Sequence, residues 1–447
     1  MLRTQHTGKD VYVIFDVGKT HKKLLLFDPS YKAIKEESSE FPTILDEDGF
    51  EADDIGLIAS WIKQKIVDLS SDPSWNIQGI NFTAYGATLV NLDEEGKPIT
   101  VLYNYLKPVE PHVEEGFYSL FGGREKFATE TSSPPLGMLN AGFQLYWLKY
   151  HKPDLFKSIK VSLFLPQYLS FLVTGRKVSE LTSIGCHTGL WDFRQNDFHS
   201  WVYDEWIQNV IAPITQEPVA GYIEIRGRSV PVGVGLHDSS ASLLPYLYMS
   251  EDSFIVISTG TWAITLNPFN HSPLTSEELN NDVLAYMLPN GDPVKAARLL
   301  MGMEHDIQVQ RIAKQFHLPS HFYETIKWDE SVYQENAGIP DNFIHSSKGI
   351  WNMETYGNGI RAYYALMRGL LNMLVQSFNL VDLPGITTVF VDGGFARNPV
   401  FIQMLKKKLP RKRFITSKVP EATAFGSLIY LRQPERIDLS DENTIML

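Results

Sequence analysis

Cysteine is almost missing from this chain, because Cys186 is the only one among 447 residues. A single cysteine cannot form an intramolecular disulfide or a cysteine-based zinc site. The composition therefore fits a reducing compartment. The first residues, Met1 to His6, are polar and lack the apolar stretch of a signal peptide, so we predict a cytoplasmic location.

Positive charge is also in short supply. The chain has 40 Lys and Arg residues against 52 Asp and Glu residues, and its formal net charge is −12. Nucleic acid repels such a chain unless a local basic patch overrides the net charge. The densest basic run, 406–413, is typical of the solvated end of a helix and the turn after it. We therefore expect no nucleic-acid partner.

Long apolar runs are missing as well. The most apolar segment, from Gly369 to Val381, is interrupted by the amides of Asn372, Gln376 and Asn379. Polar amides within the segment favour a helix in a protein core over a helix that spans a membrane. We therefore expect no membrane partner.

The length of 447 residues is enough for two domains with sizeable cores. Hydrophobic residues make up 44% and charged residues 21%, which is an ordinary globular balance. An internal repeat divides the chain, because aligning Gly18 on Gly260 superimposes two strand–glycine turn–strand patterns. We place the boundary near residue 248, which gives an N-terminal lobe over 1–248 and a C-terminal lobe over 249–447.

The two repeated glycine turns are suited to holding a polyphosphate. Glycine lets backbone amides approach phosphate oxygens and tolerates the positive φ of a tight turn. In the first turn, Asp16 can hold Mg²⁺ through water, and the lysine and threonine side chains can reach phosphate oxygens. A single glycine turn is usually only a hairpin, but the repetition favours a phosphate site. The residues assigned to nucleotide here are Asp16, Gly18, Lys19, Thr20, Lys23, Gly260 and Thr261.

A second nucleotide signal lies near the C-terminus, where Gly393-Gly394 follows a predicted strand and Asn398-Pro399 starts a helix. Paired glycines expose backbone on which a flat base can lie, and a helix N-terminus adds free amides. The Gly-Lys-Ser/Thr of a Walker loop does not follow. We assign Gly393, Gly394 and Asn398 to the nucleotide. The later run Glu421 to Gly426 predicts a closely packed helix that supports this cleft.

The segment Gly235 to Asp238 lies between a predicted strand and a helix expected over 239–247. A carboxylate at that junction can accept the proton of a substrate hydroxyl, which is the one base that phosphoryl transfer requires. Taken alone, Asp238 can equally be only the cap of the following helix. His237 is expected to be a hydrogen-bonding neighbour of Asp238 and not a second base.

Together these motifs resemble those of the FGGY carbohydrate kinases, in the family's order and over about residues 10–432. The resemblance implies an α/β fold, the duplicated actin-like ATPase (ribonuclease H-like) fold, with two lobes around a central cleft. It implies ATP and Mg²⁺ as cofactors, a small sugar as substrate and Asp238 as general base. The His237-Asp238 pair and the Gly260-Thr261-Trp262 turn are most similar to the rhamnulokinase and fuculokinase branch.

The sugar side departs from that branch. Tyr85-Gly86-Ala87-Thr88 stands where the branch usually carries a tryptophan, a glycine and a sugar-binding aspartate, and Lys19 stands where a small hydroxyl residue is common.

The expected substrate is a ketose or deoxyketose such as L-rhamnulose or L-fuculose. A kinase of a non-sugar polyol and a catalytically reduced actin-like nucleotide-binding sensor remain alternatives. We expect a monomer or a homodimer. The residues assigned to the substrate are Gly86, Ala87, Thr88, His237 and Asp238.

Overall fold

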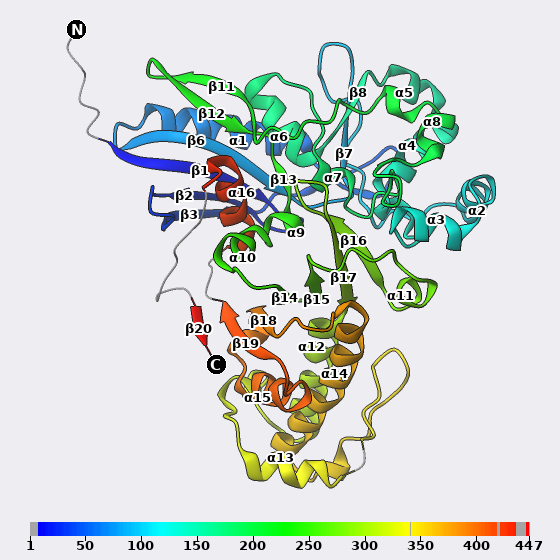
Figure 1. Cartoon of the computed structure of the whole chain (residues 1–447), viewed down its shortest axis with the longest axis vertical. Helices are drawn as coiled ribbons and strands as arrows, with labels where there is room; N and C mark the ends of the chain where they lie inside the picture. Colours follow the sequence, from blue (N-terminus) through cyan, green and yellow to red (C-terminus); the bar gives the residue numbers. More distant parts are fainter. Residues whose placement is uncertain (1–7, 340, 418–420, 435–443, 447) are drawn as a thin grey trace.

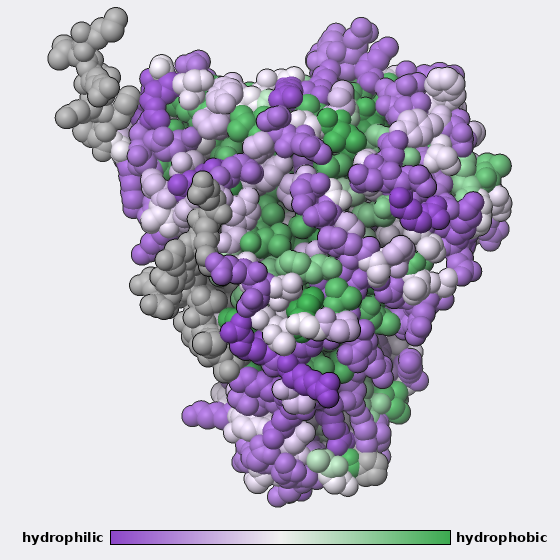
Figure 2. Space-filling model, in the orientation of Figure 1, coloured by the Kyte–Doolittle hydropathy of each residue, from purple (hydrophilic) through white to green (hydrophobic). Residues whose placement is uncertain are grey.

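The computed structural model describes residues 8–339, 341–417, 421–434 and 444–446. Within these residues the chain forms two lobes, each built on a seven-stranded sheet (Figure 1). The expectation about Met1 to His6 lies outside the described residues. Figure 2 shows hydrophilic residues over much of the outer surface and apolar residues near the middle of this face, where the lobes meet.

The N-terminal sheet combines an antiparallel meander with a parallel pair. β1 runs antiparallel to β2 and β2 antiparallel to β3, whereas β1 and β6 are parallel. The order is β11-β12-β6-β1-β2-β3, and β13 also pairs with β6. The strands are β1 (Lys9–Val17), β2 (Lys22–Phe27), β3 (Ala33–Ser39), β6 (Trp75–Ala84), β11 (Val219–Ile225), β12 (Arg228–Gly233) and β13 (Leu236–His237).

The C-terminal sheet repeats this plan. β14 runs antiparallel to β15 and β15 antiparallel to β17, whereas β14 and β18 are parallel. The order is β16-β17-β15-β14-β18-β19-β20. The strands are β14 (Phe254–Thr259), β15 (Ala263–Asn267), β16 (Val283–Met287), β17 (Pro293–Leu299), β18 (Thr388–Gly393), β19 (Arg413–Ser417) and β20 (Thr444–Met446).

The first strands of both sheets are apolar on both sides because helices or the other lobe cover both faces. In β1, Phe15 packs into the core that contains α1 (Ile55–Ser71), and Ile14 packs on the opposite side against α16 (Ala422–Arg432). In β14, Ile255 faces the core of α12 (Met301–Gln315) and α14 (Gly359–Val381), and Val256 faces the other way. The predicted repeat and the predicted duplicated α/β fold are confirmed.

The last helix, α16, returns to the N-terminal lobe. The Ser427 hydroxyl donates to the Phe82 carbonyl, and the Asn81 amide donates to the Ser427 carbonyl at 2.8 Å. A Cβ on Gly426 would lie 1.8 Å from the Ala241 carbonyl oxygen, so only glycine permits this approach. The two sheets lie on either side of residue 248, but α16 crosses back, and the lobe boundary stays a prediction.

One element expected from the sequence is wrong. The single helix over 239–247 is two short helices, α9 (Asp238–Ala241) and α10 (Leu244–Met249). Pro245 has no amide hydrogen and its ring collides with the carbonyl four residues earlier, so it can stand only at the start of a new helix. Among the described residues, none of the helices is both long and apolar enough to cross a membrane.

The remaining elements are mostly insertions on the N-terminal lobe, between β6 and β11, and helices around the C-terminal sheet. Insertions include an aromatic core around Phe117 and Trp201. The small strands are β4 (Thr43–Leu45), β5 (Glu51–Asp53), β7 (Leu89–Leu92), β8 (Val161–Phe164), β9 (Trp191–Asp192) and β10 (Asp197–Phe198). The other helices are α2 (Pro111–Leu120), α3 (Arg124–Thr131), α4 (Ala141–His151), α5 (Pro153–Ser158), α6 (Leu165–Thr174), α7 (Leu181–Ile184), α8 (Ser200–Asp204), α11 (Ser276–Asn280), α13 (Glu330–Ala337), α15 (Pro399–Lys408) and the 3₁₀ turns η1 (Gly137–Leu139), η2 (Ile207–Asn209), η3 (Phe322–Thr325), η4 (Glu354–Tyr356) and η5 (Gly394–Arg397).

Candidate active site

Asp16, at the end of β1, lies where the first glycine turn, the start of α16 and the Asp238 segment meet. The Thr423 hydroxyl donates to Asp16 Oδ2 at 2.6 Å. Burial raises the pKa of the Asp16 carboxyl to about 7; the Thr423 hydrogen bond opposes this rise, and the charges of Asp238 and Glu421 add to it. Carboxylates crowded in this way favour the arrival of a cation.

Asp238 begins α9 directly after β13. Its Oδ1 accepts the Ser239 amide hydrogen at 2.5 Å and lies 3.2 Å from His237 Nε2. Among the described residues, Oδ2 has no hydrogen-bond partner. Burial raises the pKa of Asp238 to about 6, although the hydrogen bonds from Ser239 oppose the rise. The carboxylate is thus anchored through one oxygen and open at the other, which a pure helix cap does not require.

The His237 ring packs behind Asp238. Its Nδ1 lies 3.2 Å from the Ser240 hydroxyl, and its Nε2 lies 3.1 Å from the sulfur of Cys186. Burial lowers the pKa of His237 to about 3, so the ring is neutral at physiological pH. When Ser240 donates to Nδ1, the ring hydrogen lies on Nε2 and faces Asp238. His237 is therefore a hydrogen-bonding neighbour of the carboxylate.

The Lys19 side chain, in the first glycine turn, is engaged by one aspartate and two tyrosine rings. Its Nζ donates to Asp53 Oδ2 at 2.6 Å, and it lies 5.4 Å and 5.5 Å from the ring centres of Tyr85 and Tyr105. The Tyr85 hydroxyl donates to the same Asp53 oxygen. Although burial acts to raise it, the hydrogen bonds from Lys19 and Tyr85 hold the pKa of Asp53 below its ordinary value. Asp53 is not among the residues predicted from the sequence, because an aspartate before a helix usually belongs to a cap; here Asp54 makes the cap.

The other residues in and after the first glycine turn make different contacts from those of Lys19. Lys23, opposite Asp16 across the β1–β2 pair, contacts Glu421 at 2.6 Å and Glu36 at 3.1 Å. The Thr20 side chain is exposed. Gly18 closes the turn by donating its amide hydrogen to the His21 carbonyl at 2.9 Å. Lys23 therefore lies beside Asp16 and is paired with two glutamates, whereas Lys19 is paired with Asp53.

The turn Gly86-Ala87-Thr88 lies against the base segment. A Cβ on Gly86 would lie 2.4 Å from the Cys186 sulfur and 2.9 Å from His237 Nε2, so a larger residue would displace the base segment. Ala87 has a φ of +57°, and its carbonyl accepts a hydrogen bond from Gln144. The buried Thr88 hydroxyl donates to the Gly86 carbonyl at 3.1 Å. The turn thus uses its polar groups internally, and its direct contact with substrate stays a prediction.

A pocket of about 540 Å³ lies in the C-terminal lobe between the second glycine turn, α12 and the start of α15. It joins predicted nucleotide residues from two distant segments, Gly260 and Thr261 with Gly394 and Asn398. The α12 wall is not predicted from the sequence, where its one weak signal is Gly302 in the first turn of the helix. The pocket also contains Gly302, His305, Asp306, Tyr323, Glu324, Phe395, Arg397 and Pro399.

The two glycines of the Gly393-Gly394 pair have different roles. Gly393 has a φ of +84°, and a Cβ there would lie 1.8 Å from the Thr259 carbonyl oxygen. The Thr259 hydroxyl holds the same loop by donating to the Asp392 carbonyl at 2.5 Å and accepting from the Phe395 amide at 3.1 Å. A Cβ on Gly394 would meet nothing within 4 Å. Gly393 is therefore needed for the fold, whereas Gly394 faces open space in the pocket.

Asn398 caps α15, as the sequence predicts. Its Oδ1 accepts the amide hydrogens of Val400 and Phe401, and Pro399 occupies the first turn. Its Nδ2 donates to the Tyr363 hydroxyl at 2.6 Å. The side-chain amide is therefore committed to fixing the pocket wall.

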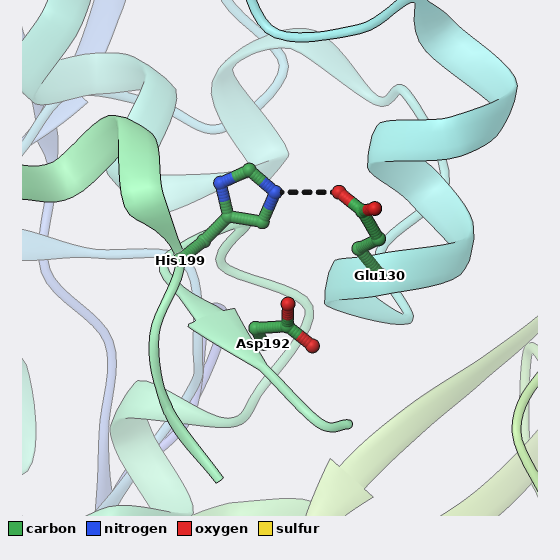
Figure 3. A group of neighbouring side chains, drawn as sticks. All are labelled: Glu130, Asp192 and His199. Atoms are coloured by element: carbon green, nitrogen blue, oxygen red, sulfur yellow. Dashed lines mark hydrogen bonds and ion pairs between the residues drawn. The ribbon is translucent and has the colours of Figure 1, made fainter. Parts of the chain in front are cut away.

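One cluster outside this site has the composition of a metal centre, namely Glu130, Asp192 and His199 (Figure 3). His199 Nε2 lies 2.9 Å from Glu130, and the Trp201 amide donates to Nδ1, so the ring hydrogen is on Nε2. Arg194 Nη2 lies 2.7 Å from Glu130 and 3.2 Å from Asp192. Since the Arg194 guanidinium bridges both carboxylates and Lys126 lies 3.8 Å from Glu130, this is an ion-pair cluster that fastens α3 to the β9–β10 hairpin.

The geometry can be compared with known proteins. The model of the FGGY family of carbohydrate kinases, N-terminal domain, matches residues 11–216, and that of carbohydrate kinase FGGY, C-terminal domain, matches residues 251–438. A rhamnulokinase of Halalkalibacterium halodurans is 28% identical over 93% of this chain and 91% of its own length. A probable L-xylulose kinase of Haemophilus influenzae is 21% identical over 95% and 90%.

Solved structures agree on the fold. A carbohydrate kinase from Novosphingobium aromaticivorans has a TM-score of 0.80 at 23% identity and covers 98% of this chain and 94% of its own. A ligand-bound xylulose kinase from Lactobacillus acidophilus has a TM-score of 0.76 at 16% identity, with coverage of 95% and 89%. At these identities the likeness extends to the fold and not to the substrate.

Proposed function

The chain belongs to the FGGY family of carbohydrate kinases, and we propose that it transfers the γ-phosphate of ATP to a hydroxyl of a ketose or deoxyketose such as L-rhamnulose or L-fuculose. The observation that carries this proposal is the Asp238 carboxylate, held through Oδ1, open at Oδ2 and electrostatically coupled to Asp16. Phosphoryl transfer to a hydroxyl requires a general base close to a carboxylate that can bind a divalent cation.

Asp238 acts as the general base. The substrate hydroxyl gives its proton to the carboxylate as its oxygen attacks the γ-phosphorus, and the bond from that phosphorus to the ADP oxygen breaks. Ser239 and His237 fix Oδ1 and thereby aim the carboxylate. The pKa of about 6 keeps most of the base deprotonated at neutral pH. A fixed and correctly charged base lowers the barrier because little reorganisation remains.

The residues around Asp16 fit a divalent cation. Asp16, Asp238 and Glu421 concentrate negative charge, and Thr423 already orients one Asp16 oxygen. These carboxylates would hold Mg²⁺, which would supply charge neutralisation for the transferred phosphoryl group. Lys23 lies opposite Asp16 and Thr20 lies in the same turn, so both would reach phosphate oxygens of a bound nucleotide, and Lys19 would do so only after leaving Asp53.

The adenosine end of ATP lies in the pocket of the C-terminal lobe. Gly394 offers open backbone for the base, while Gly260 and Thr261 present a turn toward the phosphates. Asn398 and Gly393 hold the walls in place. The triphosphate would extend from this pocket past the second glycine turn toward Asp16 and Asp238.

The test is ADP release measured across a panel of ketoses, deoxyketoses and polyols, with an Asp329→Asn variant as a folding control. Asp329 is an exposed cap of α13, remote in the fold from Asp238. One strong sugar responder is expected. A glycerol or other non-sugar polyol response would move the assignment to the polyol alternative.

The third alternative, a catalytically reduced sensor, has less support because a binding module needs no open base. Nucleotide-dependent filaments detected by light scattering, without sugar-dependent ADP release, would establish it in place of the kinase. A cytoplasmic location and a monomeric or homodimeric state remain predictions from the sequence.

A further inference from the structure

A second large cavity lies outside the site discussed above. It measures about 950 Å³ and lies between α11, the end of β17, the middle of α14 and the loop 341–348. The predicted catalytic and nucleotide residues are not part of its lining. Its walls are formed by Glu277, Asn281, Arg298, Leu299, Asp341, Phe343, Ile344, His345, Ser347, Lys348, Gly369, Asn372, Met373, Gln376, Ser377, Asn379 and Leu380.

The lining has the chemistry of a carbohydrate site. The side-chain amides of Gln376 and Asn379 have no hydrogen-bond partner among the described residues, and each offers both a donor and an acceptor to a hydroxyl. Asn372 is already bonded to Asp341 and Lys408, and Asn281 donates to the Glu277 carbonyl, so these two amides shape the wall. Phe343 adds an apolar ring to the same cavity. The formal charges of the lining nearly balance, since two carboxylates face one arginine and one lysine. A neutral ligand rich in hydroxyls suits this combination better than an ion does.

Two buried polar groups of the cavity wall have no hydrogen-bond partner among the described residues. Ser377 is 9% exposed, and its hydroxyl oxygen is buried and unpaired. Arg298 contacts Asp282 at 2.5 Å through Nη2, but its Nε is buried and unpaired. Unsatisfied buried groups are costly, so a ligand that draws either group toward the cavity gains a hydrogen bond that the wall itself does not supply.

The loop that closes the cavity is held by a buried residue. Glu304 is 1% exposed and accepts the Ser346 amide hydrogen at 2.9 Å, and the Ser346 hydroxyl donates to it as well. Gly369 lets the Phe343 ring lie directly on α14, because a Cβ there would lie 2.4 Å from the ring. The cavity is therefore a built feature and not a gap left by a loose loop.

From these observations we propose that this cavity is a second sugar-binding site, which takes an uncharged monosaccharide through the α14 amides and the Phe343 ring. The site is independent of the catalytic cleft in its residues and does not depend on the proposed kinase activity. It shares α12 with the nucleotide pocket, because Glu304 holds the loop while His305 and Asp306 line that pocket. Arg298 also lies 5.4 Å from the Trp262 ring, next to the second glycine turn.

Because one helix serves both cavities, a sugar bound at the α14 amides changes the affinity for ATP, and by linkage ATP changes the affinity for that sugar. Catalytic-cleft binding of the same sugar has to be separated from this effect. Gln376 and Asn379 make that separation possible, since both are exposed on α14 and line this cavity. Neither residue lines the nucleotide pocket or contacts Asp16 or Asp238.

The experiment is calorimetric titration of the full chain with L-rhamnose, L-fucose, D-xylose and D-glucose, with and without ATP. It compares the parent, a Gln376→Met/Asn379→Leu double variant and a Gln64→Met control on α1, where Gln64 is also an exposed helical glutamine. At least one sugar binds the parent and the control equally. It binds the double variant about tenfold more weakly, as the loss of two amide contacts predicts.

The ATP series gives the second readout. The sugar that loses affinity in the double variant alters the Kd for ATP in the parent, and this change disappears in the double variant. The proposal is overturned if none of the four sugars binds the parent, or if every bound sugar binds the double variant as tightly as the parent. It is equally overturned if the Kd for ATP is the same with and without the bound sugar. Loss of ADP release on the substrate panel is a separate result that bears on the kinase alone.

Discussion

The pocket of the C-terminal lobe and the carboxylate cluster of the N-terminal lobe are built differently. In the C-terminal lobe the wall is mostly backbone, with Gly260, Gly393 and Gly394 placing the chain where side chains would not fit or would fill the pocket. In the N-terminal lobe the wall is made of charged side chains, such as the Lys19–Asp53 pair and the Asp16–Asp238 pair. A backbone wall depends on local conformation, whereas a charged wall depends on partners from distant segments.

The largest expected effect comes from the charged half. We predict that Asp238→Ala lowers kcat about 10³-fold, because a general base contributes roughly 10²- to 10⁴-fold. ATP affinity stays at the parent value, since the nucleotide pocket does not contain Asp238. Steady-state ADP release and equilibrium ATP binding measure the two quantities. An Asp238→Ala variant with the parent rate would remove Asp238 from the mechanism.

The next effect tests the backbone half. Gly393→Ala is expected to lower the free energy of unfolding by at least about 2 kcal/mol, because the new Cβ collides with the Thr259 carbonyl and the φ of +84° is strained for alanine. Gly394→Ala serves as the matched control, because its Cβ meets open space. Urea unfolding followed by fluorescence compares the two. Equal losses in both variants would contradict the different roles assigned to the two glycines.

A smaller effect is expected at the pocket surface. Gly394→Val projects a branched side chain into the nucleotide pocket and is predicted to weaken ATP binding about tenfold, equivalent to about 1.4 kcal/mol. Calorimetry on the folded variant measures the change. Parent-like affinity for ATP in that variant would place adenosine elsewhere.

The smallest effect is a shift of a pH profile. Because Asp238 works as a base only when deprotonated, kcat/KM is expected to rise with pH through about 6 and then level off. A cation near Asp16 stabilises the deprotonated forms of Asp16 and Asp238 and so lowers their pKa values. Raising the Mg²⁺ concentration is therefore expected to move the rise of kcat/KM to lower pH. A kcat/KM profile that falls as the pH rises through 6, or one that does not shift with the Mg²⁺ concentration, would contradict the electrostatic coupling of Asp16 and Asp238.

The same contrast explains what could be predicted from the sequence. The repeated strands around Gly18 and Gly260, and the Asn398 cap, were predictable because local patterning and local turn chemistry determine them. The Lys19–Asp53 pair was not, because its members are 34 residues apart and Asp53 resembles a helix cap. The prediction of a single helix over 239–247 was wrong because Pro245 interrupts it. The apolar pattern of the segment is continuous, so it gave no sign of the break.

The α12 wall was missed for a related reason. The amide hydrogens of Gly302 and Met303 reach the Thr261 carbonyl at 3.0 Å and 3.2 Å, and a Cβ on Gly302 would lie 1.9 Å from the Gly260 carbonyl oxygen. In the sequence this is only a glycine in an amphipathic helix. Contacts between elements that are 40 or so residues apart need the fold before they can be recognised.

Product analysis by ³¹P NMR tests the central claim most directly. With ATP, Mg²⁺ and the sugar that responds in the ADP-release panel, the protein is predicted to form one equivalent of sugar phosphate for each ATP consumed, with little free phosphate. The Asp238→Ala variant is predicted to form almost none over the same period. ADP and free phosphate without sugar phosphate, or equal product from both proteins, would contradict a sugar kinase with Asp238 as its base.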